Sequence, residues 1–142
     1  MVETQFRFRS DEPVGDPAVT VDSFGDQTNA SAVRLEPGED ARDLLPYLDR
    51  IKLVEVNFPA YTDGRGYSAA RILREAGYTG ELRAVGDVLI DQLAMMRRCG
   101  FDSFAPNTEL NTADAEAALG RYGDVYQPTT DGRVPLWTKR HG

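Results

Sequence analysis

The chain has 142 residues and a formal net charge of −7, which fits one domain and disfavours binding to nucleic acid or to an anionic membrane surface. A single cysteine, Cys99, and a single histidine, His141, exclude an internal disulfide and a cysteine-ligated iron–sulfur cluster and argue against a zinc site. No segment reaches the roughly 20 apolar residues of a membrane span, and no signal-peptide core begins the chain, so we expect a cytoplasmic protein without a metal site.

The first forty residues predict an irregular, β-rich segment. Short apolar stretches around Phe6, Val19 and Ala32 alternate with polar residues and are separated by proline and glycine turns. We expect short antiparallel strands that cover one edge of the main domain. Residues 41–50 then predict a short helix, although Pro46 removes one of its hydrogen bonds.

Residues 53–122 predict alternating strands and helices. The segment 53–58 alternates in polarity and predicts a strand. An apolar stripe at Ala69, Ile72, Leu73 and Ala76 predicts a helix that ends at Gly77. The later elements follow in the same order: a strand at 82–85, a helix begun by Asp87 and ended by Gly100, a strand at 101–104, and a helix capped by Asn111 or Thr112.

Successive strands joined by helices pair in parallel with right-handed crossovers. The predicted fold class is therefore α/β, with a small, mainly parallel sheet that is open or resembles half of a barrel. We expect one domain over residues 1–142, made of a β-rich edge (1–40), a βα core (41–126) and a C-terminal tail (127–142).

Functional groups of parallel α/β folds gather in the loops after the C-terminal ends of the strands. The sequence Asp-Gly-Arg-Gly at 63–66 lies in such a loop before a helix N-terminus, where backbone amides and an arginine can bind an anion. The candidate anion- or partner-binding residues are Asp63, Gly64, Arg65, Gly66, Tyr67, Ser68, Asp87 and Asp91. No catalytic residue can be assigned.

Each of these residues also has a purely structural interpretation. The glycines and Arg65 suit a tight turn with a solvated side chain, and Asp87 suits a helix N-cap. Cys99 at a helix C-terminus is more typical of a buried structural thiol than of a redox centre. Trp137, in the tail, suits either a docking segment or an edge strand.

Several motifs together resemble one bacterial family, domain-of-unknown-function family nine-three-four. They are DGRGYS (63–68), AR (70–71), GELRA (80–84), GDV (86–88), DQ (91–92) and RCGFD (98–102). The resemblance is close over residues 53–105 and looser at the flanks. Its members are described as candidate oxidoreductases linked to sulfite reduction, so the resemblance implies a role beside sulfite reductase in sulfate assimilation.

This chain has no recognisable flavin or nicotinamide motif, so we expect an accessory protein that binds sulfite reductase or its electron donor. Its acidic character suits a basic patch on such a partner. The alternative is a small oxidoreductase or other enzyme with an anion-binding rim at the C-terminal ends of the strands. The sequence leaves open the cofactor, including a loosely held flavin, and the oligomeric state.

Overall fold

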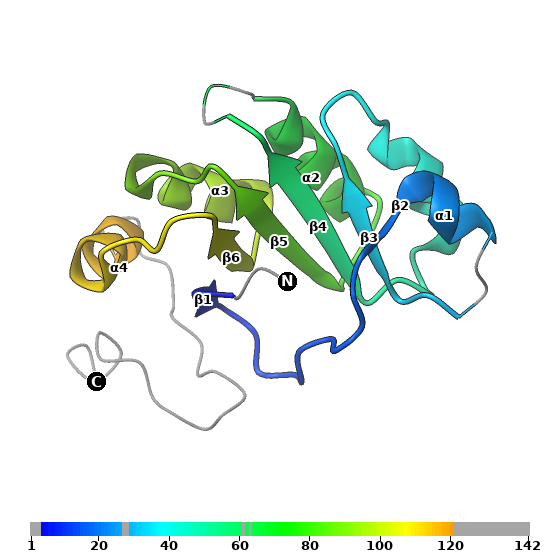
Figure 1. Ribbon diagram of the computed structural model, residues 1–142, viewed down its shortest axis with the longest axis horizontal. Coiled ribbons are helices and arrows are strands. Elements are labelled where there is room, and N and C mark those ends of the chain that lie inside the picture. Colours follow the sequence, from blue (N-terminus) through cyan, green and yellow to red (C-terminus); the bar gives the residue numbers. More distant parts are fainter. Residues whose placement is uncertain (1–3, 27–28, 61, 63, 121–142) are drawn as a thin grey trace.

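The computed structural model describes residues 4–26, 29–60, 62 and 64–120. Its strands form one six-stranded sheet in the order β1-β6-β5-β4-β3-β2 (Figure 1). They are β1 (Phe6–Arg7), β2 (Val19–Thr20), β3 (Ala32–Leu35), β4 (Leu53–Phe58), β5 (Glu81–Gly86) and β6 (Ser103–Pro106). All pairs from β2 to β6 are parallel, whereas β1 runs antiparallel to β6. The predicted α/β fold with a mainly parallel sheet is confirmed.

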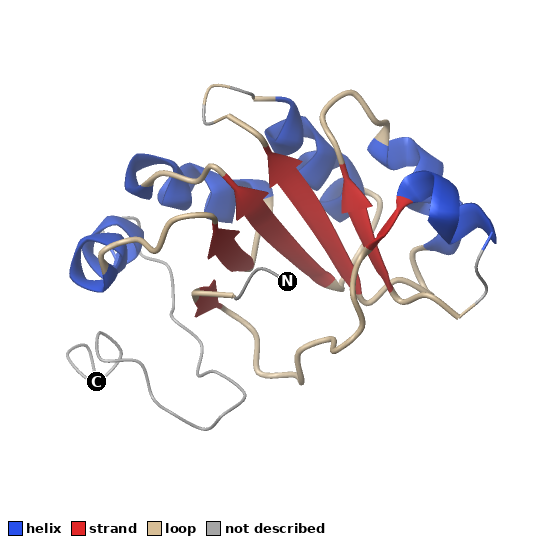
Figure 2. Cartoon of the chain, viewed as in Figure 1, coloured by secondary structure: helices blue, strands red, loops and turns tan. Residues whose placement is uncertain are grey.

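The helices cover one face of this sheet. They are α1 (Val21–Asp26), the 3-10 helix η1 (Ala41–Tyr47), α2 (Arg65–Glu75), the 3-10 helix η2 (Ile90–Gln92), α3 (Leu93–Cys99) and α4 (Thr112–Gly120). From β2 to β6 each strand lies beside the next one in the chain, so crossovers of one hand place their helices on one side. Figure 2 shows helices behind the central strands, while the near face of those strands carries no helix within the described ranges.

The core lies between the sheet and the helices. Val54, Val56 and Phe58 point into it from β4, and Leu82 and Ala84 point into it from β5 at the same register. Leu73 of α2, Met96 of α3 and Leu119 of α4 belong to the same core cluster and are fully buried. Apolar residues recur at every second position in the strands and at helical spacing in the segments between them. Together they form one apolar core, as the sequence pattern indicates.

The N-terminal segment differs from the prediction. Only β1 pairs antiparallel, at the edge of β6; β2 and β3 join the opposite edge in parallel. The prediction of antiparallel strands at one edge was wrong here because α1, a short helix that we did not expect, separates β2 from β3 and allows a parallel crossover.

The boundaries of other elements also shift. The helix expected at 41–50 is a 3-10 helix, which ends at Tyr47 just after Pro46 and begins after Asp40, whose carboxylate accepts a hydrogen bond from the Arg42 amide. Asn111 is the residue that caps α4, because its side-chain oxygen accepts from the Asp114 amide at 2.9 Å. These are local effects that apolar periodicity alone does not resolve.

The third predicted strand starts two residues later than expected. Gly100 ends α3 in the left-handed region at φ 119°, and the backbone amide of Asp102 then donates to the Leu82 carbonyl before β6 begins.

No described helix is both long and apolar enough to cross a membrane. The division into one domain with a separate tail stays a prediction, since residues 127–142, with Trp137 and His141, lie outside the described ranges.

Candidate functional site

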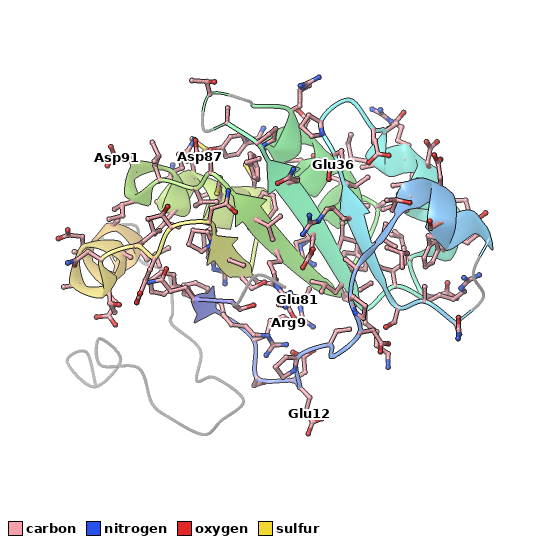
Figure 3. The ribbon with its side chains drawn as sticks, viewed as in Figure 1. Arg9, Glu12, Glu36, Glu81, Asp87 and Asp91 are labelled. Atoms are coloured by element: carbon pink, nitrogen blue, oxygen red, sulfur yellow. The ribbon has the colours of Figure 1, made fainter. Side chains whose placement is uncertain are left out.

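The C-terminal ends of β3, β4, β5 and β6 meet at one edge of the sheet, hereafter the C-terminal edge. Figure 3 shows Glu36, Asp87 and Asp91 at this edge, and Glu81, Arg9 and Glu12 toward the other. Further acidic side chains follow these strands in the sequence, Glu39 and Asp40 after β3 and Glu109 after β6. The exposed part of this edge is therefore predominantly acidic.

The N-terminus of α2 lies at the C-terminal edge, as predicted. Gly64 is its N-cap residue and Arg65 its first residue, and both are exposed. Arg65 lines a cavity of about 20 Å³ together with Glu36, Glu39 and Asn57. A water molecule needs roughly 10–15 Å³, so this cavity has room for little more than one water.

The second glycine of the Asp-Gly-Arg-Gly motif serves packing. A Cβ atom on Gly66 would lie 2.5 Å from the Phe58 ring and 2.9 Å from Val56, so only glycine lets α2 approach β4 this closely. Gly64 is different: its φ is −89°, and a Cβ atom there would meet no atom within 4 Å. Nothing in the local backbone or packing requires a glycine at position 64.

Tyr67 and Ser68 also differ, because the first packs into the core and the second lies at the surface. The Tyr67 ring packs edge-on against Phe58 with 5.6 Å between ring centroids. Burial raises the pKa of the Tyr67 phenol, and a hydrogen bond with the Gln92 side chain only partly offsets this. Ser68 is exposed. Tyr67 therefore contributes to the core beneath the edge, whereas Ser68 remains available at the surface. Asp63 lies outside the described residues.

Asp87 is not the N-cap residue of η2 or α3, so the prediction that it begins a helix was wrong. Its backbone amide donates to the Phe58 carbonyl at 2.7 Å, directly after the turn at Gly86. The next helical turn, η2, has Leu89 as its N-cap, and α3 begins only at Leu93. Asp87 is half-buried and Asp91 is exposed in η2, so the two carboxylates do not share one helix face. Their role in binding stays a prediction.

A row of polar residues crosses the helix-free face of the sheet. In register across β3, β4, β5, β6 and β1 it runs Arg34, Glu55, Arg83, Ser103, Arg7. The Glu55 carboxylate accepts from Arg34 Nη2 at 2.9 Å and from Arg83 Nη1 at 3.1 Å. Such pairs on neighbouring strands lie at contact distance because adjacent strands are less than 5 Å apart.

Glu81 adds a second carboxylate to this face. It is 2% exposed, and its Oε1 accepts from both Nε and Nη2 of Arg7, at 3.2 and 3.0 Å. Its Oε2 accepts from Arg83 Nη2 at 3.1 Å. Burial by itself would raise the pKa of Glu81, but the hydrogen bonds from Arg7 and Ser103 and the charge of Arg83 outweigh it and hold the pKa below its ordinary value of 4.5.

The ion pairs continue around the edge formed by the strand N-termini. Arg7 also contacts Asp11, Asp11 contacts Arg9, and Arg9 contacts Asp102 at 2.9 Å. Asp102 in turn contacts Arg74 of α2 at 3.1 Å. Burial raises the pKa of Asp102, although Arg9, Arg74 and the Leu82 amide all favour its ionised form. Alternating charges thus connect the helix-free face to the helix layer.

Arg74 anchors this end of the molecule. Its guanidinium donates to the carbonyls of Gly100, Tyr78 and Gly80 at 2.8–3.0 Å. It thereby joins the end of α2 to the loops before β5 and β6. A Cβ atom on Gly100 would lie 2.5 Å from Arg74 Cγ, so the glycine leaves room for the arginine.

This network was not predicted from the sequence. The signal was present, because β3, β4 and β5 each place one charged residue between apolar neighbours: Arg34, Glu55 and Arg83. Charged residues on the same face of adjacent strands predict cross-strand pairs once the register is known. Arg74 carried no comparable signal, since an arginine on a helix is usually solvated.

The fold and its two polar regions define a small α/β protein with helices on one face of a mainly parallel sheet and an acidic C-terminal edge. A family model described as "Bacterial protein of unknown function (DUF934)" matches residues 32–137. The chain therefore belongs to this bacterial family. Neither the curated proteins nor the solved structures include a match to the chain.

The motifs behind the resemblance fall into two groups in space. GELRA (80–84) and RCGFD (98–102) supply Glu81, Arg83, Gly100 and Asp102, which the ion pairs and the Arg74 contacts account for. The described part of DGRGYS, residues 64–68, lies at the C-terminal edge, where packing accounts for Gly66 and Tyr67. Packing does not account for Gly64 or for the exposed Ser68. Both of these residues lie at the C-terminal edge.

Proposed function

We propose that this protein is a cytoplasmic accessory of assimilatory sulfite reduction that binds sulfite reductase or its electron donor through the C-terminal edge. The observation that carries the proposal is the acidic surface at this edge, to which Glu36, Asp87 and Asp91 contribute (Figure 3). The link to sulfite reduction comes from the family resemblance, and the acidic edge supplies the surface.

The charge distribution supports docking to a basic partner. In the loops after β3 to β6, each taken with the first residue of the helix that follows, Arg65 is the single basic residue by sequence, whereas acidic residues occur after β3, β4, β5 and β6. Complementary charges accelerate the encounter of two proteins and orient them, and the effect weakens as salt screens it. Exposed Leu89, 37% accessible, adds an apolar group beside Asp87 and Asp91.

The shape of the edge supports the same choice. Small-molecule sites usually enclose roughly 300–1,000 Å³. The cavity beside Arg65 measures about 20 Å³, and Glu36 and Glu39 line it, so an anion there would meet two carboxylates. A protein partner needs no such cavity, because it binds across a surface.

The alternative function, a small oxidoreductase or other enzyme with an anion-binding rim, has one observation in its favour. Arg65 begins α2, an 11-residue helix whose N-terminal amides attract anions. The visible absorption spectrum of freshly purified protein separates the two ideas. A flavin-type absorption band would favour the oxidoreductase, and its absence together with capture of sulfite reductase would favour the accessory.

The test of the proposed function is growth of a deletion strain on sulfate, sulfite or cysteine as the sulfur source. The accessory role predicts that cysteine alone restores growth and that a plasmid copy of the gene restores growth on all three. Normal growth of the deletion strain on sulfate would exclude the role.

A further inference from the structure

Two exposed apolar side chains lie beside acidic residues of the C-terminal edge. Among the residues that the structure describes, four large apolar side chains are exposed: Leu45, Tyr47, Leu89 and Met95. The first two belong to η1, and the last two lie at η2 and α3, which follow each other without a break. Scattered apolar residues are ordinary on a protein surface, so such a pair is informative only where the needs of folding do not explain it.

Leu89 occupies a position where a polar capping residue would serve the fold better. It is the N-cap residue of η2, with an extended backbone, and its side chain makes no capping hydrogen bond. The Gln92 side chain already accepts from the Leu89 backbone amide at 3.0 Å, which is one half of a capping box. The other half needs a serine or threonine hydroxyl at position 89. Leucine supplies no such hydroxyl, and at 37% exposure its side chain is not part of the buried core either.

Met95 is the most exposed of the four residues, at 46%. Because η2 leads directly into α3 and residues four apart on a helix are neighbours, Met95 lies next to the exposed Asp91. Its neighbour in the chain, Met96, is fully buried, so α3 carries one methionine in the core and one at the surface. Methionine adapts to irregular apolar surfaces and is enriched at protein interfaces.

Acidic and apolar side chains therefore alternate along this stretch, in the order Asp87, Leu89, Asp91 and Met95. Figure 3 shows the two aspartates at the C-terminal edge. We propose that Leu89 and Met95 form the apolar centre of the docking surface and contact an apolar or aromatic side chain of the partner protein. Lysine or arginine side chains of the partner flank that contact and pair with Asp87 and Asp91.

This inference rests on the proposed function and names the chemistry of its partner: an apolar side chain between basic ones. A second copy of this chain fits less well, because its own aspartates would meet those of the first copy. The two kinds of contact also respond differently to salt. Salt screens the pairs between exposed charges, whereas it does not weaken the burial of apolar side chains.

The test measures the dissociation constant of the purified full chain with sulfite reductase and with its electron donor, at low and high salt. Leu89→Ser and Met95→Gln should each weaken binding about tenfold at both salt concentrations, since a few central residues carry most of the binding energy of an interface. Leu45→Ser is the matched control: Leu45 is also 37% exposed, but α2 lies between its helix η1 and α3 (Figure 1). It should bind as the wild type does.

Thermal unfolding separates a binding role from a structural one. Leu89→Ser completes the capping box, so its melting temperature should equal or exceed that of the wild type even though it binds more weakly. Met95→Gln should keep the wild-type melting temperature, because glutamine and methionine have similar helix propensities and the position is exposed. A lower melting temperature in both variants, in step with weaker binding, would make these residues structural and overturn the inference.

The methionine methyl groups provide a second readout in the wild type. With ¹³C-labelled methionine methyls, the Met95 signal should shift or broaden saturably as the partner is added, whereas the signal of buried Met96 should stay in place. Binding of the wild type that neither Leu89→Ser nor Met95→Gln weakens would overturn this inference and leave the proposed function intact. Failure of the wild type to bind either protein would overturn both. A wild-type dimer that dissociates in Met95→Gln would assign the surface to a second copy and also overturn the inference.

Discussion

Replacing Glu81 by glutamine should destabilise the protein strongly. The Glu81 side chain is 2% exposed, and the guanidinium groups of Arg7 and Arg83 that it neutralises are 6% and 9% exposed. Glu81→Gln removes the charge and turns an acceptor into a donor that faces the arginines. Breaking a buried ion pair from one side costs about 3–5 kcal/mol. In a chain of this size that lowers the melting temperature by roughly 10–20 °C.

The assay is thermal and urea unfolding of wild type and variant at pH 7, followed by far-ultraviolet circular dichroism. Glu75→Gln is the matched control: Glu75 is exposed at the end of α2, so its replacement should change stability by no more than about 0.5 kcal/mol. A loss of less than about 1 kcal/mol in Glu81→Gln would refute the argument that the helix-free face depends on this carboxylate.

The pH dependence of the same pair of proteins has a defined sign. Because the folded-state pKa of Glu81 lies below its ordinary value of 4.5, its ionised form stabilises the fold above that pH. This contribution is lost as the pH falls from 4.5 through the lowered pKa. The difference in unfolding free energy between wild type and Glu81→Gln should therefore shrink in acid; a constant difference from pH 7 to pH 3 would contradict the assignment.

Three further predictions concern α2 and its ends. Arg74→Ala should cost about 3 kcal/mol in urea unfolding, because several backbone carbonyls and a buried carboxylate lose their donor, whereas exposed Arg71→Ala should change stability by less than about 0.5 kcal/mol. Gly66→Ala should cost about 1–3 kcal/mol by overpacking against an aromatic ring of β4, and Gly64→Ala should be nearly neutral; equal effects would contradict the close approach at position 66. Arg65→Ala should leave the melting temperature unchanged and impair growth on sulfate; wild-type growth at normal expression would remove Arg65 from the site.

The sequence was sufficient to predict the α/β class because it repeats a strand followed by a helix, with Val54, Val56 and Phe58 showing the period of two and Ala69, Ile72 and Leu73 the helical one. It could not place β2 and β3 correctly. Those strands are short, and α1, which decides between parallel and antiparallel pairing, has too few residues to show a clear period.

The site was predictable to the same limited degree. The rule that loops after parallel strands share one edge placed Arg65, Asp87 and Asp91 at the C-terminal edge. Gly66 is needed for close packing, and Asp87 lies in a turn rather than at a helix N-cap. Both facts depend on distances between elements, which no local pattern encodes. The ion network depends on the register of five strands, and for that reason it emerged only in three dimensions.

The most direct test of the account is binding of the purified chain to sulfite reductase and to its electron donor at low and high salt. The double variant Asp91→Lys/Glu109→Lys reverses charge at the C-terminal edge, and Glu12→Lys/Glu75→Lys makes the same charge change at exposed positions elsewhere. The account predicts salt-sensitive binding of the wild type to one of these two proteins, retained in the Glu12 and Glu75 variant and weakened at least about tenfold in the edge variant. Equal binding of the two double variants, or no binding of the wild type to either protein, would contradict it.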